Sequence, residues 1–223
     1  MLNIAIDGPA GAGKSTIAKL IAKKYAIAYL DTGAMYRALA YHVIQMNIKI
    51  DDHEKINTIV AKLDMDVSYV GEEQHVFVCN QDVTQHLRGY EMGLAASDVS
   101  KIPSVRLRLV DLQREIAARR DCVLDGRDIG SFVLPNATIK FFLTADIKER
   151  ARRRFVEFKE KGIDTAFETV LKDIEARDAQ DSSRALAPLK IVSDAIIVDS
   201  TQMTLEDVFK TMSKRIDEVI NRR

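Results

Sequence analysis

The chain has 223 residues, and its 47% hydrophobic and 30% charged content is typical of a globular protein with one α/β core. Lysine plus arginine equals aspartate plus glutamate, 33 each, so no global field draws the chain to nucleic acid or a membrane surface. No apolar run is long enough to span a membrane, no signal-peptide pattern opens the chain, and the two cysteines form no C-x-x-C pair. We therefore expect the reducing cytoplasm. We also expect a monomer, with neither nucleic acid nor a membrane as a partner.

A glycine-rich stretch, G-P-A-G-A-G-K-S-T, occupies residues 8–16 and fits the pattern G-x-x-x-x-G-K-[ST]. An apolar run at 4–6 precedes it and a helical pattern at 17–22 follows it, as this motif requires. Glycines let backbone N–H groups curl around phosphate oxygens, while Lys14 can reach the β- and γ-phosphates and the Ser15 hydroxyl can ligate Mg²⁺. We expect ATP to bind Gly8, Pro9, Ala10, Gly11, Ala12, Gly13, Lys14, Ser15 and Thr16.

The next segments are a predicted strand over 26–30 and a predicted helix over 34–46. Two interpretations of the residues between them stay open. In the first, Thr32 is a helix N-cap and Arg37 is a solvated surface charge. In the second, both side chains face a bound anion at the carboxyl end of a strand, where open α/β sheets place their ligands.

Residues 51–100 have a different pattern, in which apolar and polar residues alternate between tight turns. This pattern predicts a small antiparallel lobe inserted into a parallel architecture. Its expected parts are a helix over 56–63, strands over 65–70 and 75–79, a turn at 71–73 and a turn into a third strand at 80–84. Pro103 should begin the next helix, whose arginines form mostly an exposed face.

A short core strand over 122–125 runs into the sequence G-R-D-I-G. Asp125 could hold the Mg²⁺ shell through water, and Arg127 could bind phosphate with both arms of its guanidinium. Asp128 could accept hydrogen bonds from a base or a sugar. The alternative is a tight turn with a surface Arg–Asp pair, but the glycine-rich loop favours the functional interpretation.

A strand over 139–143 is followed by a predicted helix that Asp146 and Glu149 open as a capping box. Gly162 breaks this helix, and a second one should run from about 165 to 177, before a polar stretch at 178–187. Two helices rich in arginine make a plausible lid over bound phosphates. A helical hairpin with solvated charges is the alternative, and would be preferred without the glycine-rich loop.

A fifth parallel strand over 195–199 and an amphipathic helix over 205–216 close the chain. The predicted fold is α/β, of the P-loop NTPase type: a parallel five-stranded sheet flanked by helices, with a small antiparallel nucleoside-monophosphate-binding insert and a helical lid. We expect one kinase domain over 1–223. Its core covers about 1–50, 101–145 and 188–223, with the insert at about 51–100 and the lid at about 146–187.

Five motifs, in order along nearly the whole chain, resemble the bacterial-type cytidylate kinases, members of the nucleoside monophosphate kinase group. They are I-D-G-P-A-G-A-G-K-S-T, L-D-T-G-A-M-Y-R, the 65–100 insert ending A-A-S-D-V-S-K-I-P-S-V-R, L-D-G-R-D-I-G and R-D-A-Q-D-S-S-R-A-L-A-P-L. The first is shared by many P-loop proteins, whereas the other four are highly specific. The resemblance implies a (d)CMP kinase that uses ATP and Mg²⁺ to phosphorylate CMP and dCMP by direct in-line transfer.

The resemblance also implies roles for particular residues. Catalytic roles fall to Lys14, Arg127 and Arg184, the metal ligand is Ser15, and the lid residues near ATP are Arg150 and Arg154. The substrate-binding set is Thr32, Tyr36, Arg37, Ser97, Arg106, Asp125, Gly126, Arg127, Asp128, Arg177 and Asp181. The family often has serine where Thr32 stands, which keeps the hydroxyl and adds a methyl group here.

Two other functions fit parts of the sequence. The nearer is a P-loop kinase for a different acceptor, such as another nucleotide or a metabolite hydroxyl. The more distant is a nucleotide-binding switch that signals through partners. The N-K-x-D motif of guanine-nucleotide switches is absent from the sequence, and a switch would hydrolyse its nucleotide slowly without an acceptor.

Overall fold

The computed structural model describes residues 1–71 and 73–222 in two compact units. Unit 1 comprises residues 1–27 and 123–223, and unit 2 comprises residues 28–122. The turn predicted at 71–73 includes position 72, which lies outside the described residues. None of the helices formed by the described residues combines the length and the apolar character that crossing a bilayer requires.

The main sheet has five strands in the order β2-β6-β1-β7-β8, which confirms the predicted five-stranded α/β architecture. Its strands are β1 (Asn3–Asp7), β2 (Ala28–Asp31), β6 (Cys122–Gly126), β7 (Ile139–Thr144) and β8 (Ile196–Asp199). β1 pairs in parallel with β7, and β7 pairs in parallel with β8. Because helices can cover both faces of such a sheet, its central strands are almost continuously apolar and buried.

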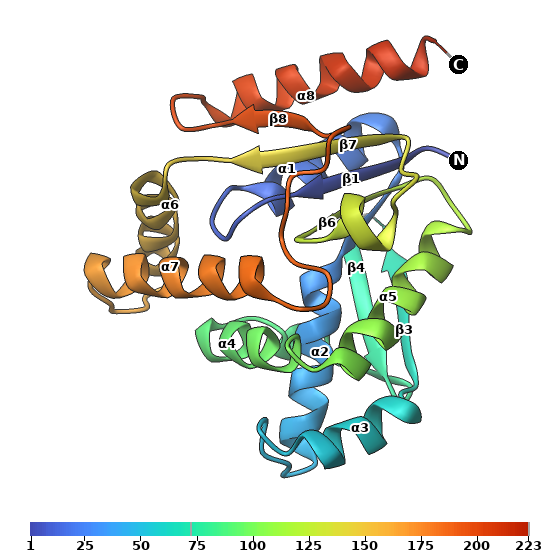
Figure 1. Cartoon of the computed structure of the whole chain (residues 1–223), viewed down its shortest axis with the longest axis vertical. Helices are drawn as coiled ribbons and strands as arrows, with labels where there is room; N and C mark the ends of the chain where they lie inside the picture. Colours follow the sequence, from blue (N-terminus) through green and yellow to red (C-terminus); the bar gives the residue numbers. More distant parts are fainter. Residues whose placement is uncertain (72, 223) are drawn as a thin grey trace. The chain divides into compact units, whose positions relative to one another are not determined.

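The helices of unit 1 lie between and after these strands (Figure 1). They are α1 (Lys14–Tyr25), α6 (Ile147–Glu160), α7 (Phe167–Ser183) and α8 (Leu205–Ile220). α6 and α7 pack against each other, with the rings of Phe155 and Phe167 edge to face at a centroid distance of 6.0 Å. Gly162, whose φ is +69°, makes the turn between them, as the sequence predicted.

Two details of this pair of helices differ from expectation. α7 continues to Ser183, six residues past Arg177, because the polar residues of its last turns are paired with arginines rather than left in a loop. The capping box that opens α6 is only half formed. Asp146 accepts from the N–H groups of the first turn, but the Glu149 carboxylate pairs with arginines of α6 instead of returning to the cap.

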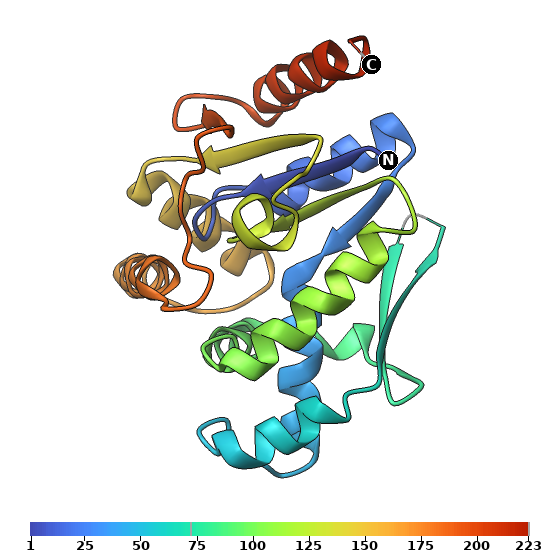
Figure 2. The same cartoon turned by 45° about the vertical axis from the view of Figure 1, so that its right-hand side comes forward.

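Unit 2 contains the predicted antiparallel lobe, which Figure 2 shows in blue-green. Besides β2, the elements of unit 2 are α2 (Thr32–Gln45), α3 (His53–Ala61), β3 (Met65–Val70), β4 (Glu73–Val78), β5 (Gln81–Asp82), a 3₁₀ turn (Thr84–His86), α4 (Tyr90–Val99) and α5 (Pro103–Ala117). β4 pairs antiparallel with both β3 and β5, which confirms the three-stranded sheet. Pro103 stands in the first turn of α5, as expected for a residue without an N–H to donate.

The start of α2 shows that Thr32 is not the N-cap, contrary to one of the two interpretations of the sequence. The N-cap is Asp31, whose carboxylate accepts a hydrogen bond from the Ala34 N–H at 2.9 Å. Thr32 is the first helical residue and is buried, so it does not cap the helix. Both aspartate and threonine can cap, and the choice depends on where the backbone enters the helix.

Candidate active site

The glycine-rich loop connects β1 to α1 in a shape that two of its glycines require. A Cβ on Gly8 would lie 2.0 Å from the Leu143 carbonyl oxygen of β7, so no other residue fits there. Gly13 has a φ of +87° and no side chain to cap α1. The first N–H groups of α1 are therefore available to an anion at the positive end of the helix dipole.

Lys14 begins α1 and is buried. Its ammonium group donates a hydrogen bond to the Pro9 carbonyl at 2.7 Å, which holds the side chain back over the loop. Burial, and next the positive charge of Arg127, lower the pKa of Lys14 well below its usual value. The negative charge of a bound phosphate would oppose this lowering of the Lys14 pKa, so the surroundings of this lysine suit phosphate.

The next residue joins the loop to the end of β6. Ser15 Oγ donates a hydrogen bond to Asp125 Oδ2 at 2.7 Å, although 110 positions separate them in the chain. Asp125 is buried at the carboxyl end of β6, one of the inner strands of the sheet. A hydroxyl and a carboxylate at this spacing are both hard oxygen ligands.

A buried cluster of opposite charges joins the loop after β6 to the end of α7. Arg127 Nε donates to Asp181 Oδ2 at 2.6 Å, and Arg184 Nη2 donates to the other oxygen of the same carboxylate. Asp181 is 1% exposed. Burial alone would raise the pKa of Asp181, but the charges of Arg127 and Arg184 outweigh it and hold that pKa below its usual value.

A third arginine belongs to this cluster, and Lys14 and Asp125 lie near it. Arg177 stands one turn before Asp181 on α7, and its charge also lowers the pKa of both Lys14 and Asp181. Unit 1 thus brings Lys14 close to Arg127, Arg177 and Arg184, with Asp125 and Asp181 among the carboxylates that interact with them. Several basic side chains in one place can bind an anionic ligand.

A buried aspartate that the sequence interpretation passed over holds the loop after β6 in place. Asp7 ends β1 and accepts hydrogen bonds of 2.7 Å from the N–H groups of Ile129 and Gly130. Burial raises the pKa of Asp7 to about 6. Asp128 directly precedes this pair and is itself buried. The signal was available, since a carboxylate at the end of an otherwise apolar strand needs buried partners.

The four arginines at 150–154 separate into different environments. Arg150 is buried against the glycine-rich loop and donates to the Ala10 carbonyl at 3.0 Å. Arg154 pairs with Glu157 at 2.7 Å, and its guanidinium carbon lies 4.4 Å from the centre of the Phe158 ring. The remaining two, Arg152 and Arg153, both bind Glu149.

The predicted substrate-binding residues of unit 2 form their own contacts within that unit. The Arg106 guanidinium lies 5.5 Å from the centre of the Tyr36 ring and donates to the Ser100 carbonyl at 3.2 Å. The Ser100 hydroxyl in turn donates to the Ser97 carbonyl at 2.7 Å. Arg37 pairs with Asp31 at 2.8 Å. Arg106 and Tyr36 are therefore brought together, as a shared role would require.

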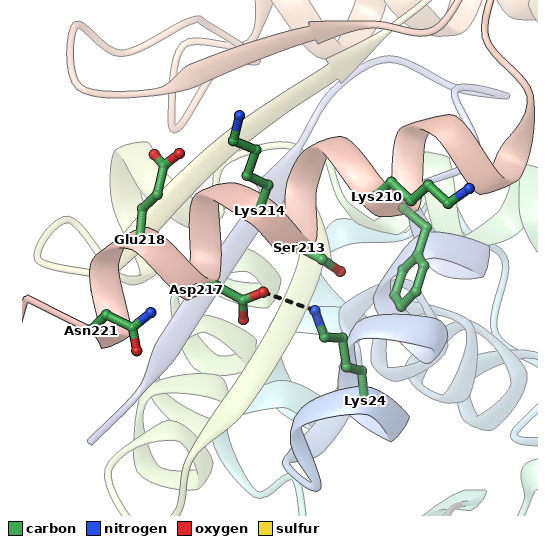
Figure 3. Close-up of a pocket in the computed structure, with 8 residues that line it drawn as sticks. Lys24, Lys210, Ser213, Lys214, Asp217, Glu218 and Asn221 are labelled. Carbon is green, nitrogen blue, oxygen red and sulfur yellow. Dashed lines mark hydrogen bonds and ion pairs between the residues drawn. The ribbon is translucent and has the colours of Figure 1, made fainter.

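A separate groove of about 380 Å³ lies between α1 and α8 and is lined by none of the predicted site residues (Figure 3). Two of its charges pair with each other, since Lys24 Nζ donates to Asp217 Oδ2 at 3.0 Å, and the Tyr25 hydroxyl donates to Asp217 Oδ1 at 2.7 Å. The Ser213 hydroxyl beside them is covered by protein.

Solved structures with the same fold include kinases. A crystal structure of an uncharacterized protein from Eubacterium ventriosum aligns with a TM-score of 0.52 at 15% identity, covering 100% of both chains. Shikimate kinase from Bacteroides thetaiotaomicron aligns with a TM-score of 0.50 at 11% identity, covering 99% of this chain and 98% of its own. These likenesses concern the fold. Together with the glycine-rich loop and its buried lysine, they define the class as proteins with a P-loop fold.

Sequence comparison narrows the class. The family model described as cytidylate kinase matches residues 4–218. A cytidylate kinase from Caldicellulosiruptor saccharolyticus is 47% identical over 219 residues, covering 98% of this chain and 97% of the relative. One from Alkaliphilus oremlandii is 49% identical over 207 residues, covering 93% and 94%. The chain belongs to the cytidylate kinase family.

Proposed function

We propose that the chain transfers the γ-phosphoryl group of ATP directly to CMP and dCMP, giving CDP and dCDP. Membership of the cytidylate kinase family supports this activity, its nucleotide substrates and a divalent metal ion with ATP. The observation that supports the proposal is that Lys14, at the end of the glycine-rich loop, shares one cluster of charges with Arg127, Arg177 and Arg184. The reaction needs such charges, because its transition state spreads negative charge over the transferred group.

The phosphate donor would bind the loop at residues 8–16. Its backbone N–H groups would surround the β-phosphate, and Lys14 would neutralise the charge that develops between the β- and γ-phosphates. Arg127 and Arg184, which now share the Asp181 carboxylate, can turn their remaining N–H groups to the transferred phosphoryl. The protein positions groups and neutralises charge, so no side-chain nucleophile is needed.

The residues at the start of α1 fit Mg²⁺. This ion keeps several waters and takes one or two protein oxygens with the phosphates, rather than a full protein cage. The described residues contain no group of three or more histidine, cysteine or acidic side chains that could form such a cage. Ser15 would be a direct ligand and Asp125 would hold a bound water. When bound, the ion would supply positive charge that offsets the charge of the phosphates.

We propose acceptor-binding residues within each unit separately. In unit 1 these are Asp125, Gly126, Arg127, Asp128, Arg177 and Asp181, and in unit 2 they are Thr32, Tyr36, Arg37, Ser97 and Arg106. Asp128 and Arg127 would read cytosine: a carboxylate accepts from the exocyclic amino group, and a guanidinium donates to acceptor atoms of the base. The arginines of unit 2 would bind the acceptor phosphate.

A coupled assay of ADP formation tests this function. With ATP and Mg²⁺ present, the rate is measured without an acceptor and with CMP, dCMP or UMP. We expect strong dependence on CMP and dCMP and a low rate without an acceptor. Acceptor-independent hydrolysis alone would favour a nucleotide switch, and dependence on another acceptor alone would favour a different P-loop kinase. Light scattering on the same sample tests the proposed monomer.

A further inference from the structure

The peptide unit of Ala10, inside the glycine-rich loop, is held from both sides by side chains of the two-helix segment α6–α7. The Ala10 N–H donates to Asp178 Oδ1 at 3.1 Å. Its carbonyl accepts from Arg150 Nη1 at 3.0 Å. Asp178 stands 168 positions away in the chain, so these bonds depend on the tertiary fold. Both polar groups of one loop residue are thus oriented by the lid.

The two side chains also hold each other. Arg150 Nη1 lies 2.5 Å from Asp178 Oδ2, and Arg150 Nε donates to the Ala145 carbonyl at 2.9 Å. The Arg150 side chain is 7% exposed and that of Asp178 is 19% exposed. Water competes little at such a site, and a guanidinium with several fixed acceptors has one preferred orientation. The pair is a rigid support.

The loop backbone also lies directly on α6. A Cβ placed on Gly11 would be 3.0 Å from the Arg150 carbonyl oxygen and 3.2 Å from the Arg150 Cβ, and Gly11 has a φ of +75°. Gly8, Gly11 and Gly13 give this loop unusual backbone freedom, which costs conformational entropy when the loop is ordered. A fixed contact at Ala10 reduces the number of shapes that the loop can adopt before a ligand binds.

We propose that Asp178 and Arg150 are positioning residues that hold the glycine-rich loop in the shape that binds the donor phosphates. The proposal rests on the function proposed above and assigns Arg150 to the loop rather than to direct contact with ATP. The two charges must act together. A lone carboxylate beside Ala10 would repel a triphosphate, whereas Arg150 neutralises Asp178 and leaves it only as a hydrogen-bond acceptor.

The test compares Asp178→Ala, Asp178→Asn and Glu175→Ala, an exposed acidic residue of the same helix, with the wild type. The Kd for ATP without acceptor is measured by calorimetry, and the KM for ATP and for CMP by the coupled assay. Loss of a charge-supported hydrogen bond predicts about tenfold weaker ATP binding in Asp178→Ala and less than about a twofold change in the KM for CMP. Asp178→Asn keeps an acceptor for the Ala10 N–H and should recover part of the loss, and Glu175→Ala should match the wild type.

Unchanged ATP affinity in Asp178→Ala, or equal losses for ATP and CMP, would overturn the proposal. If Asp178→Ala does not fold, Arg150→Lys replaces it. Lysine keeps the positive charge but cannot bridge the Ala145 and Ala10 carbonyls. ATP should therefore bind more weakly to Arg150→Lys, while the KM for CMP stays constant. Unaltered ATP affinity in this variant would also contradict the proposal. A wild type that binds ATP without phosphorylating CMP would overturn the proposed function instead, and the ATP affinities would still decide the role of Asp178.

Discussion

Asp7 and Gly130 are joined by a hydrogen bond of 2.7 Å across 123 positions of sequence, from the Gly130 N–H to Asp7 Oδ2. The other oxygen of the same carboxylate accepts from Ile129. Because Asp7 directly precedes the glycine-rich loop, one buried side chain ties the start of the donor site to the loop that carries Arg127 and Asp128. The glycine-rich loop and the loop after β6 should therefore keep their positions relative to each other when nucleotides bind.

The raised pKa of Asp7 predicts a pH-dependent stability. Burial, and to a smaller extent the charge of Asp128, raise this pKa from 3.8 to about 6, while Lys14 and the two backbone N–H groups oppose the rise. The folded protein therefore holds this proton more tightly than the unfolded chain does. Between about pH 4 and pH 6 the Asp7 contribution to stability should fall as pH rises, by on the order of 2–3 kcal/mol.

Asp7→Asn is the comparison for this effect, since asparagine does not titrate. Urea unfolding of both proteins at pH 4, 5, 6 and 7 would give their difference in unfolding free energy. The wild type should lose stability relative to the variant as pH rises, whatever the absolute cost of turning an amide group toward two N–H donors. A difference that does not vary with pH would show that Asp7 is already ionised at pH 4.

Lys14→Ala should abolish phosphoryl transfer and leave the fold intact. The ammonium group is held over the glycine-rich loop by its hydrogen bond to the Pro9 carbonyl, and its loss removes stabilisation of the developing phosphate charge. We expect kcat to fall at least about 100-fold, the effect typical of losing one such group. Lys19→Ala, an exposed lysine of the same helix, is the matched control. A variant that kept a sizeable fraction of wild-type kcat, with an unchanged melting curve, would refute the assignment of the loop.

Asp181→Asn should destabilise the protein and weaken CMP binding. It removes the carboxylate charge that the buried Arg127 and Arg184 guanidiniums share, and breaking such a buried pair costs about 3–5 kcal/mol. Because the pKa of Asp181 is lowered, its stabilising contribution is present above the usual aspartate pKa and is lost as pH falls below it. Asp98→Asn, which breaks an exposed pair with Lys101, should cost less than about 1 kcal/mol. Both variants are compared with the wild type by thermal unfolding. If Asp181→Asn and Asp98→Asn lowered the stability equally, the role given to the buried cluster would be wrong.

Asp128→Ala should weaken discrimination between cytosine and uracil. Uracil presents a carbonyl where cytosine presents an amino group, so the carboxylate favours only the latter. Each polar group left unsatisfied costs roughly 1–3 kcal/mol, or about 5- to 150-fold in kcat/KM. The variant should lose kcat/KM for CMP, change the KM for ATP little and narrow the gap between CMP and UMP at saturating ATP. Equal losses for both acceptors would reassign Asp128 to the sugar, the metal shell or the turn.

Local pattern in the sequence was enough for the main elements and for the donor loop. The strand–loop–helix at 3–25 follows from an apolar run, three glycines and a helical repeat, each a property of neighbouring residues. The antiparallel lobe follows in the same way from alternation at 65–70 and from its turns. The order of the five motifs was also sufficient to identify the family that the comparisons confirm.

Only the tertiary structure showed which partners the buried charged side chains have. Asp178 and Asp181 looked like part of a polar loop, but pairing with Arg150 and Arg127 makes them the last turns of α7. Arg150 is one of four arginines within five residues of α6. The sequence alone does not show that Arg150, rather than one of the other three, contacts Ala10. Periodicity reports which face of a helix is apolar. The partners of these buried charges lie outside any local pattern, 28 positions apart for Arg150 and Asp178 and 54 for Arg127 and Asp181.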